Sequence, residues 1–308
     1  MKSSRPSRLS LIIFGIVFCY AAICVVLAVV LTEIAFRPSL VHVYNLFPVT
    51  SRLGIDLQNV AVTSIDGIKL HAWFAQPSNA NGDSVILLHG VGDTRQAMLG
   101  FARIFLSSGY AVLMPDSRGH GESGGIPTYG IKEADDLARW YGWLKSSNNP
   151  GCVYGLGESM GAAILLQSAN RVPFCAIAAE SPFASFREIA YIRVGQIFGM
   201  GSWLGKTLLR PTVELAFLYG RLTRGVWLSN ASPEKSVAKS WIPTLLIHGM
   251  ADTNIPLQQS EKIRAQNQAA VVLWKVPNAG HCGASAVAGR EFAARVVGWF
   301  ASHRKKLQ

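Results

Sequence analysis

A serine between two glycines stands where an apolar run meets a helix-forming run, in Gly157-Glu158-Ser159-Met160-Gly161. The residues before it, 152–156, predict a buried strand, and those after it, 162–167, predict a helix. A sharp turn between the two leaves no room for side chains two residues either side of the serine, which explains both glycines. The pattern therefore predicts a strained serine at a sheet edge, the type of residue that attacks carbonyl groups.

The same glycines also fit a second interpretation. Gly155, Gly157 and Gly161 form a loosened version of a dinucleotide-binding pattern, and Glu180 follows where a ribose-binding acid could lie. The spacing is not G-x-G-x-x-G, however, and the stretch comes after several earlier strands and helices. A serine nucleophile is favoured over a nucleotide site, and we expect no cofactor.

The partners that a nucleophilic serine needs lie downstream. Asp252 follows the predicted strand at 243–248, and His281 follows the predicted strand at 270–276. Residues just past the carboxyl ends of parallel strands meet at one sheet edge. His281 is predicted to act as the general base for Ser159, and Asp252 to orient the histidine and stabilise its charged form. Taken singly, Asp252 could be a turn or capping aspartate and His281 a solvated loop histidine, and Glu180 is the substitute acid.

Two backbone N–H groups are candidates for an oxyanion hole, the set of donors that binds a developing negative oxygen. Met160 N–H opens the helix after the serine, where the helix dipole favours negative charge. Val91 N–H lies in His89-Gly90-Val91-Gly92-Asp93, a loop that follows the predicted strand at 84–88. The glycines of this loop are also compatible with an ordinary strand-to-helix turn.

These motifs together resemble the α/β-hydrolase superfamily over residues 56–303, and within it the Bem46-type branch of membrane-anchored serine hydrolases. The resemblance rests on the chain order Ser159, Asp252, His281 and on the motifs at 88–90, 116–123, 157–161, 248–252 and 280–281. It implies a hydrolase of esters, thioesters or amides with these three residues as the catalytic triad. It also implies that residues 116–123, with His120, form a structural loop and not a catalytic one.

The order of predicted elements agrees with this fold class. A hairpin is expected from Leu57–Ser64 and Ile68–Ala75, turning at Asp66-Gly67. Strand alternating with helix then predicts a three-layer α/β fold with a mainly parallel sheet and one catalytic domain over 56–303. The remaining strands are expected at 84–88, 110–115, 152–156, 174–179, 243–248 and 270–276, and helices at 95–106, 131–145 and 285–303.

The N-terminal region predicts a membrane anchor. Residues 9–31 are uncharged and strongly apolar, long enough at about 1.5 Å per residue to cross a hydrocarbon core about 30 Å thick. The basic flank 1–8 carries Lys2, Arg5 and Arg8, which predicts a cytoplasmic N-terminus and a hydrolase domain on the non-cytoplasmic side. A cleaved secretion signal is the alternative, but no A-x-A-like cleavage site follows. Residues 32–55 are expected to form a linker.

Residues 183–235 are expected to form a helical lid inserted between two core strands. They mix large apolar residues with basic ones, and part of the net charge of +11 lies here. Such a segment could rest on an anionic membrane or line an acyl pocket, or it could simply pack on the core. The expected partners are therefore a small-molecule or lipid-like acyl substrate and the membrane.

The cysteines and histidines predict neither a disulfide scaffold nor a metal site. Cys152 and Cys175 are expected to be core residues in strands, and Cys282, beside His281, is a weak candidate nucleophile. No metal-ligand spacing is present. No nucleic-acid reading motif accompanies the basic residues, so nucleic-acid binding is not expected. The function predicted is a serine hydrolase, and the alternative is a catalytically silent, membrane-tethered binding protein of the same fold.

Overall fold

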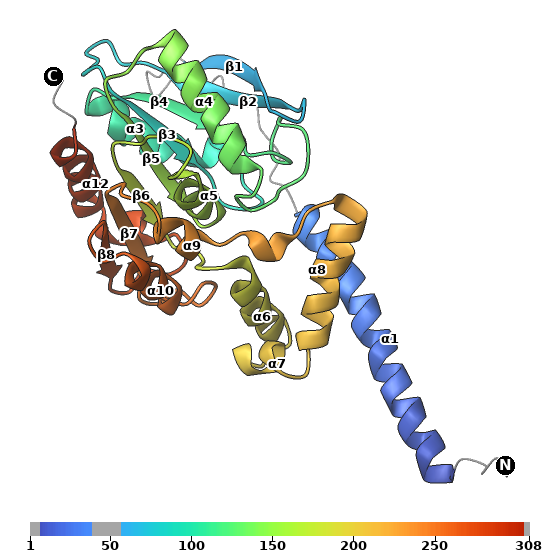
Figure 1. Cartoon of the computed structure of the whole chain (residues 1–308). Helices are drawn as coiled ribbons and strands as arrows, with labels where there is room; N and C mark the ends of the chain where they lie inside the picture. The colour runs from blue at the N-terminus through green and yellow to red at the C-terminus, as the bar shows by residue number, and fades with distance from the viewer. Residues whose placement is uncertain (1–6, 39–56, 305–308) are drawn as a thin grey trace. The chain divides into compact units, whose positions relative to one another are not determined.

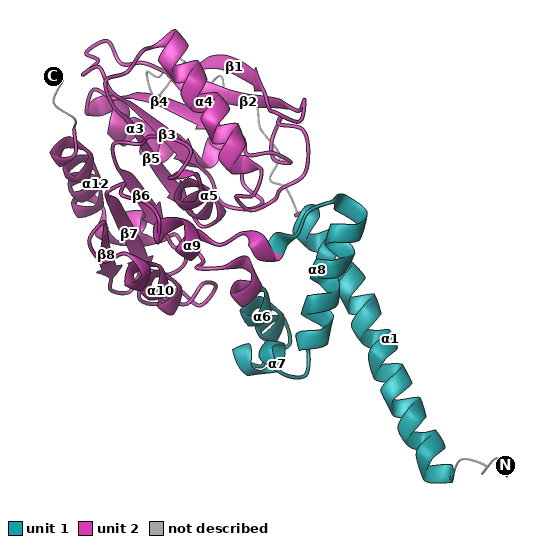
Figure 2. Cartoon of the chain, in the orientation of Figure 1, with its two compact units in different colours: residues 1–36, 190–228 teal, residues 37–189, 229–308 magenta. Residues whose placement is uncertain are grey.

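The computed structural model describes residues 7–38 and 57–304. The described chain divides into two compact units, shown in Figure 2. One contains the N-terminal helix, up to Phe36, together with residues 190–228. The other contains the sheet and its covering helices, within residues 37–189 and 229–308. Most of the predicted linker 32–55 lies outside the described residues.

The larger unit is built on an eight-stranded sheet in the order β1-β2-β4-β3-β5-β6-β7-β8. Strands β1 and β2 are antiparallel, β2 is antiparallel to β4, and every other pair is parallel. The three-layer, mainly parallel α/β-hydrolase fold expected from the sequence is confirmed. The strands span Gln58–Thr63, Lys69–Ala75, Ser84–Leu88, Ala111–Pro115, Val153–Glu158, Ile177–Glu180, Thr244–Gly249 and Val271–Val276.

Helices cover both faces of this sheet (Figure 1). On one face the rings of α3 (Leu99–Ser107) pack against those of α12 (Arg290–Ser302), with Phe105 and Phe300 stacked 5.4 Å apart. Successive residues of a strand face opposite sides, and Val85 and Leu87 of β3 join these aromatic rings in one buried core. The other helices of this unit are η1 (Arg95–Met98), α4 (Glu133–Ser147), α5 (Met160–Ser168), α9 (Pro233–Val237), α10 (Gln258–Gln266) and α11 (Ala284–Ala288).

Two predicted elements differ from the structure at particular residues. The single helix expected at 285–303 is two helices, α11 and α12, because Gly289 between them has φ 50° and ψ −114°, a conformation that ends one helix and redirects the chain. The first hairpin turns at Asp66-Gly67 as predicted, with Gly67 at φ 80°. Helix α1, Arg8–Phe36, continues beyond residue 31, where the apolar run ends.

Cys152 and Cys175 form a disulfide, which corrects the prediction that they are only core residues. The two residues lie just before β5 and β6, which are neighbouring parallel strands. Parallel neighbours bring residues at equivalent positions close together, and the Cα atoms are 5.7 Å apart. The sequence did not reveal this pairing because the cysteines lie 23 positions apart and nothing in their spacing distinguishes a disulfide from two buried thiols.

The smaller unit is entirely helical in its described part. Besides α1 it contains most of α6 (Phe186–Ile197), then α7 (Ser202–Lys206) and α8 (Arg210–Arg224). Helix α8 packs along α1. It ends at Gly225, which takes the left-handed conformation common just after helices. Within residues 183–235 the structure has the helices α6, α7 and α8, the short turn η2 (Leu228–Asn230) and the start of α9. That this segment is a lid over Ser159 stays a prediction.

Candidate active site

Ser159 lies at the turn between β5 and α5, in a strained conformation with φ 50° and ψ −110°. Both glycines around it are required by close packing. A Cβ atom on Gly157 would come within 2.6 Å of the Gly161 carbonyl carbon, and one on Gly161 within 2.3 Å of the Leu88 oxygen. The Ser159 N–H donates to the Glu180 carbonyl at 2.8 Å, which ties the turn to the neighbouring strand β6. The sheet therefore holds the strained serine in place.

The structure brings the three predicted side chains together in one hydrogen-bonded chain. His281 Nε2 lies 3.0 Å from Ser159 Oγ, and His281 Nδ1 lies 2.8 Å from Asp252 Oδ2. Each residue follows a different parallel strand, namely β5, β7 and β8. Since the carboxyl ends of these strands lie at the same sheet edge, residues far apart in sequence meet there. This arrangement allows a proton to pass from Ser159 to His281 while Asp252 fixes the ring.

Asp252 is held by its own loop as well as by His281. Its Oδ1 accepts hydrogen bonds from the N–H groups of Asn254, at 3.0 Å, and Ile255, at 2.9 Å. Burial opposes ionisation of this carboxyl, but the hydrogen bonds from His281 and Ile255 outweigh it and lower the pKa of Asp252 below its ordinary value. The carboxyl is thus kept as a carboxylate, the form that orients a histidine.

A second histidine, His248, stabilises the loop that carries Asp252. His248 is buried at the end of β7, with Nε2 donating to the Ile255 carbonyl at 2.9 Å and Nδ1 accepting from the Ser260 hydroxyl at 2.7 Å. Burial lowers the pKa of His248, so the ring is neutral. Sequence reasoning included His248 only as part of a motif. Its position at the end of a buried strand, four residues before Asp252, was the available signal.

The loop that carries Val91 lies against Ser159. A Cβ atom on Gly90 would be 3.7 Å from the Ser159 Cβ. The Gly90 carbonyl accepts from His89 Nδ1 at 2.7 Å, and the Gly92 N–H donates to His120 Nε2 at 3.1 Å. Hydrogen bonds on either side of Val91 therefore fix the loop. Met160 N–H, the first in α5, has no acceptor in a preceding turn of its helix.

His120 occupies a structural position, as the resemblance implied. Besides binding Gly92, its Nδ1 donates to the Arg118 carbonyl at 3.1 Å, and the ring is fully buried. Burial lowers the pKa of His120. His89 is buried beside it, with ring centroids 5.1 Å apart, and its Nε2 accepts from Ser117 N–H at 3.0 Å. Two neutral histidines thus connect the Val91 loop to the loop after β4.

Two glutamates lie side by side under the candidate site, and sequence reasoning missed them as a pair. Glu158 and Glu180 are directly opposite each other on β5 and β6. Burial, followed by repulsion from Glu180 and Asp93, raises the pKa of Glu158 to about 8. Burial also raises the pKa of Glu180 to about 7, although a hydrogen bond from Ala284 N–H opposes the shift. These carboxyls hold protons near neutral pH.

The two reserve candidates do not occupy catalytic positions. Glu180, the substitute acid, binds Ala284 N–H at 2.8 Å, while His281 pairs with Asp252. Cys282 is kept as a thiol, because burial and the nearby carboxylates, Glu158 first, raise the pKa of its side chain. A thiol is a poor nucleophile compared with a thiolate.

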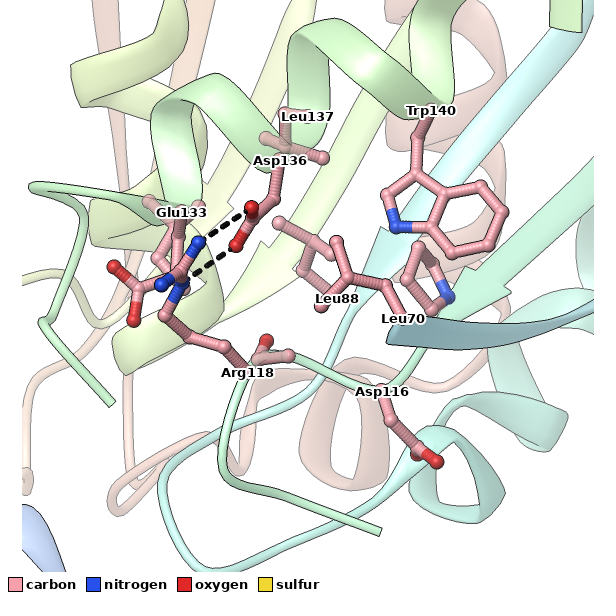
Figure 3. Close-up of a pocket in the computed structure, with 11 residues that line it drawn as sticks. Leu70, Leu88, Asp116, Arg118, Glu133, Asp136, Leu137 and Trp140 are labelled. Atoms are coloured by element: carbon pink, nitrogen blue, oxygen red, sulfur yellow. Dashed lines mark hydrogen bonds and ion pairs between the residues drawn. The ribbon is translucent and has the colours of Figure 1, made fainter. Parts of the chain in front are cut away.

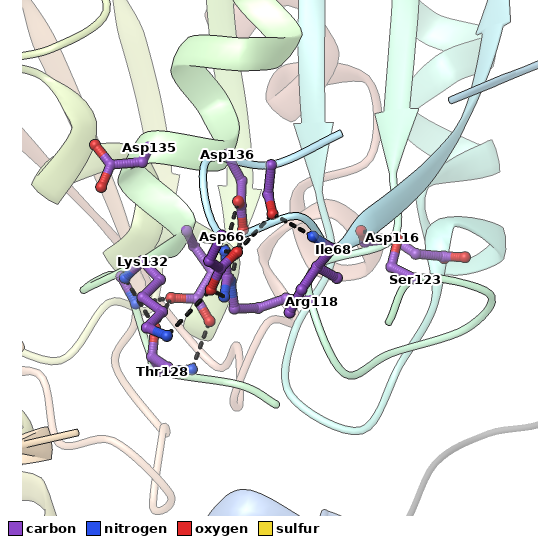
Figure 4. Close-up of polar contacts among 12 residues, drawn as sticks. Asp66, Ile68, Asp116, Arg118, Ser123, Thr128, Lys132, Asp135 and Asp136 are labelled. Carbon is purple, nitrogen blue, oxygen red and sulfur yellow. Dashed lines mark hydrogen bonds and ion pairs between the residues drawn. The ribbon is translucent and has the colours of Figure 1, made fainter. Parts of the chain in front are cut away.

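The loop at 116–123 is held in place by ion pairs of its buried residue Arg118. Arg118 donates to Asp136 through Nε, at 2.7 Å, and Nη2, at 2.6 Å, and it also contacts Asp66 at 3.0 Å (Figure 4). Lys132 joins Asp66 at 3.1 Å. Behind this network lies a small pocket, in which Figure 3 shows Arg118 turned toward Asp136 with Leu88 and Trp140 nearby. The lining contains none of Ser159, Asp252 and His281.

Comparisons with known proteins agree with the fold. The alpha/beta hydrolase family matches residues 85–295. The uncharacterized protein YqkD of Bacillus subtilis is 31% identical over 206 residues, 65% of this chain and 65% of its own length. The match thus spans just under two thirds of that relative. Lysophosphatidylserine lipase ABHD12 of Danio rerio is 26% identical over 198 residues, which cover 62% of this chain and 49% of the lipase.

A solved structure has the same fold. The Pyrococcus furiosus esterase Pf2001 superimposes with a TM-score of 0.70 at 24% identity, covering 88% of this chain and 98% of the esterase. The chain belongs to the alpha/beta hydrolase family, and its fold and relatives are those of a hydrolase. The predicted superfamily is confirmed; the resemblance to the Bem46-type branch stays a prediction.

Proposed function

We propose that this protein is a serine hydrolase that cleaves a carboxylic ester, a thioester or an amide through an acyl-enzyme. The observation that carries the proposal is the continuous hydrogen-bonded chain from Asp252 through His281 to Ser159, with distances of 2.8 and 3.0 Å. Geometry of this kind activates a hydroxyl that is otherwise a weak nucleophile. The esterase and lipase among its relatives agree with hydrolysis of an acyl bond.

In the proposed reaction, Ser159 Oγ attacks the carbonyl carbon while His281 Nε2 takes the hydroxyl proton. The N–H groups of Val91 and Met160 bind the negative oxygen that forms. The imidazolium, stabilised by Asp252, then gives its proton to the departing alcohol, thiol or amine, leaving the acyl group on Ser159. A water activated by His281 releases the acid and restores the serine.

Labelling with a fluorophosphonate probe tests this proposal, because the probe forms a covalent bond with activated serines. Wild type is expected to be labelled and Ser159→Ala is not. Cys282→Ala is the matched control, since it alters the neighbouring nucleophilic atom and should keep full labelling. Labelling of Ser159→Ala at the wild-type rate would reject the assignment and leave the silent binding protein or another nucleophile.

We also propose that α1 crosses a membrane with its N-terminus in the cytoplasm and the hydrolase unit on the opposite side. Helix α1 is long and apolar enough to span a bilayer, and Arg8 with the basic residues before it precedes the span. The Cys152–Cys175 disulfide supports this topology, because disulfides persist in oxidising compartments outside the cytosol. An uncleaved anchor predicts retention in membranes after a carbonate wash, with an intact N-terminus. A soluble form that begins near residues 30–40 would show a cleaved signal instead.

A further inference from the structure

Helix α8 packs along α1 in the same direction, through polar contacts at both ends and in the middle. The Tyr20 hydroxyl donates to the Leu208 carbonyl at 2.5 Å, next to the start of α8. Thr32 Oγ1 lies 3.0 Å from the Ala216 carbonyl. Arg224 Nη2 binds both carboxylate oxygens of Glu33, at 2.9 and 3.0 Å. The start of α8 is thus fixed at the level of Tyr20.

The two halves of α1 have different surroundings. Between Arg8 and Cys19 almost every side chain is exposed, although nearly all are apolar. From Tyr20 onward a stripe at four-residue intervals is buried, comprising Cys24, Ala28, Thr32 and Phe36. This spacing puts the stripe on one face of the helix, and Gly220 of α8 lies against Phe36. Among the residues that the structure describes, α1 is therefore packed against protein from Tyr20 toward its C-terminal end.

The segment from Ile197 to Leu208, whose last residue accepts the hydrogen bond from Tyr20, forms an apolar tip. Five of its large apolar side chains are 47–63% exposed, namely Ile197, Phe198, Met200, Trp203 and Leu208, while Leu204 is buried. Lys206 lies on the same short stretch and Arg210 just beyond it, and both are exposed. Apolar side chains with basic neighbours are typical of segments that lie in the interface of a membrane. The tip is continuous with the bare apolar half of α1 through the Tyr20–Leu208 hydrogen bond.

Bilayer thickness decides how deep this tip lies. The stretch from Leu9 to Tyr20 is roughly 18 Å long at about 1.5 Å per residue, too short alone for a hydrocarbon core of about 30 Å. An interfacial segment enters the hydrocarbon by about 5–10 Å. If the tip beside Tyr20 does so, the stretch from Leu9 to Tyr20 ends only a few ångströms short of the opposite surface of the hydrocarbon core. The Arg8 side chain can bridge that remaining distance. Placing Tyr20 at the bilayer centre instead would draw the charges of Lys206 and Arg210 into the hydrocarbon, where an ionised side chain is strongly disfavoured.

We propose that residues 197–208 are a second membrane anchor, which enters the leaflet on the hydrolase side of the membrane beside α1. Phe198 and Trp203 lie among the lipid acyl chains, and Lys206 and Arg210 reach the lipid phosphates. The C-terminal half of α1 then stands largely outside the hydrocarbon, covered by α8. This proposal rests on the proposed membrane span of α1.

The test uses the full chain in vesicles of phosphatidylcholine and phosphatidylglycerol, with a nitroxide label on one introduced cysteine. The background carries Cys19→Ala, Cys24→Ala and Cys282→Ala, which leaves the disulfide in place. Labels are placed by Phe198→Cys, Trp203→Cys, Phe14→Cys and Leu222→Cys. Leu222 is the matched control, because it is an exposed apolar residue, 75% accessible, near the other end of α8.

Collision of each label with oxygen, which concentrates in lipid, and with a water-soluble nickel complex gives its depth. The oxygen-to-nickel ratio is expected to be several-fold higher at positions 198 and 203 than at 222, and highest at 14. If the label at position 203 has the same oxygen-to-nickel ratio as the label at 222, while the label at 14 lies deep in lipid, the second anchor is overturned and the membrane span is not. If the label at position 222 also has a high ratio, α8 lies in the hydrocarbon along its length, and the proposed depth of the tip is overturned. A low ratio at 14 overturns the membrane span, and with it this proposal; the fluorophosphonate result is independent of each of these outcomes.

Discussion

Gly92 donates its N–H to His120 Nε2 at 3.1 Å, which connects the loop of Val91 to a buried histidine 28 residues later. His120 is therefore expected to position an oxyanion donor without taking part in proton transfer. In His120→Ala the loop loses this contact. Loss of one oxyanion donor costs about 10²–10³ in kcat, so displacement of Val91 should lower kcat by about 10- to 100-fold.

The measurement is the kcat of an acyl ester at a temperature where His120→Ala is folded. His303→Ala is the control, since His303 lies at the end of α12 and contacts Trp299. It should keep wild-type kcat. Unchanged kcat in folded His120→Ala would show that the loop holds its position without the histidine.

Replacement of the hydrogen-bonded residues should affect turnover as a unit. Ser159→Ala and His281→Ala are each expected to lower kcat by about 10⁶-fold, because either loss removes the activated nucleophile. Asp252→Asn should lower it less, by about 10⁴-fold, since the amide favours the wrong histidine tautomer. Glu180→Gln tests the alternative acid: it should keep most of the activity, and a loss as large as that of Asp252→Asn would contradict the assignment.

The partly buried carboxyl of Glu158 predicts a pH dependence of stability. Its pKa in the folded protein is about 8, against about 4.3 in an unfolded chain. Because the folded state holds the proton more tightly, this stabilising contribution is complete below about pH 4.3 and is lost as the pH rises through about 8. Glu158→Gln removes the charge, so its Tm should exceed that of wild type by several degrees at pH 9 and match it near pH 5.

The check is a series of melting curves between pH 5 and pH 9. Glu291→Gln serves as the control, because Glu291 is exposed on α12 and pairs there with Arg295. Its Tm difference from wild type should not change with pH. A constant difference for Glu158→Gln would mean that the carboxyl is already ionised at neutral pH.

The sequence predicted those features that local geometry dictates. Gly157 and Gly161 reveal the turn because a side chain at Gly157 would meet the backbone of Gly161 and one at Gly161 would meet the backbone of Leu88. The ends of β7 and β8 placed Asp252 and His281. The contacts that the sequence did not reveal are made between distant segments. Neither the pairing of Cys152 with Cys175 nor that of Tyr20 with Leu208 leaves a periodic pattern, because each depends on which strands or helices become neighbours.

The disulfide between Cys152 and Cys175 should contribute measurably to stability. Closing a loop of this size restricts the unfolded chain and is worth about 3 kcal/mol. Cys152→Ser and Cys175→Ser are each expected to lower the free energy of unfolding by about this amount. Wild type with dithiothreitol should approach the same value, measured by urea denaturation. Cys282→Ser is the control, and equal stability of all the variants would show that the two thiols are not joined in the protein.

The preferred substrate is expected to carry an apolar acyl chain. If residues 183–235 shape the acyl pocket, as the sequence predicts, longer chains bury more methylene groups, each worth about 0.8 kcal/mol. The kcat/KM of an octanoyl ester should therefore exceed that of the acetyl ester by at least about tenfold, a difference that needs only two buried methylenes. The measurement uses the full chain in vesicles with soluble p-nitrophenyl esters.

The same assay tests the contribution of the basic residues in this segment. An amphiphilic acyl substrate carrying a phosphate should be hydrolysed faster when its vesicles contain anionic lipid, because the exposed Lys206 and Arg210 attract anionic head groups. Raising the salt concentration should reduce that gain, since about 0.1 M salt screens charges beyond about 10 Å. The neutral octanoyl ester is the control and should respond little to lipid charge. A preference for acetyl over octanoyl, together with no salt-sensitive effect of anionic lipid, would instead identify a hydrolase of small esters or peptides that is held at the membrane for another reason.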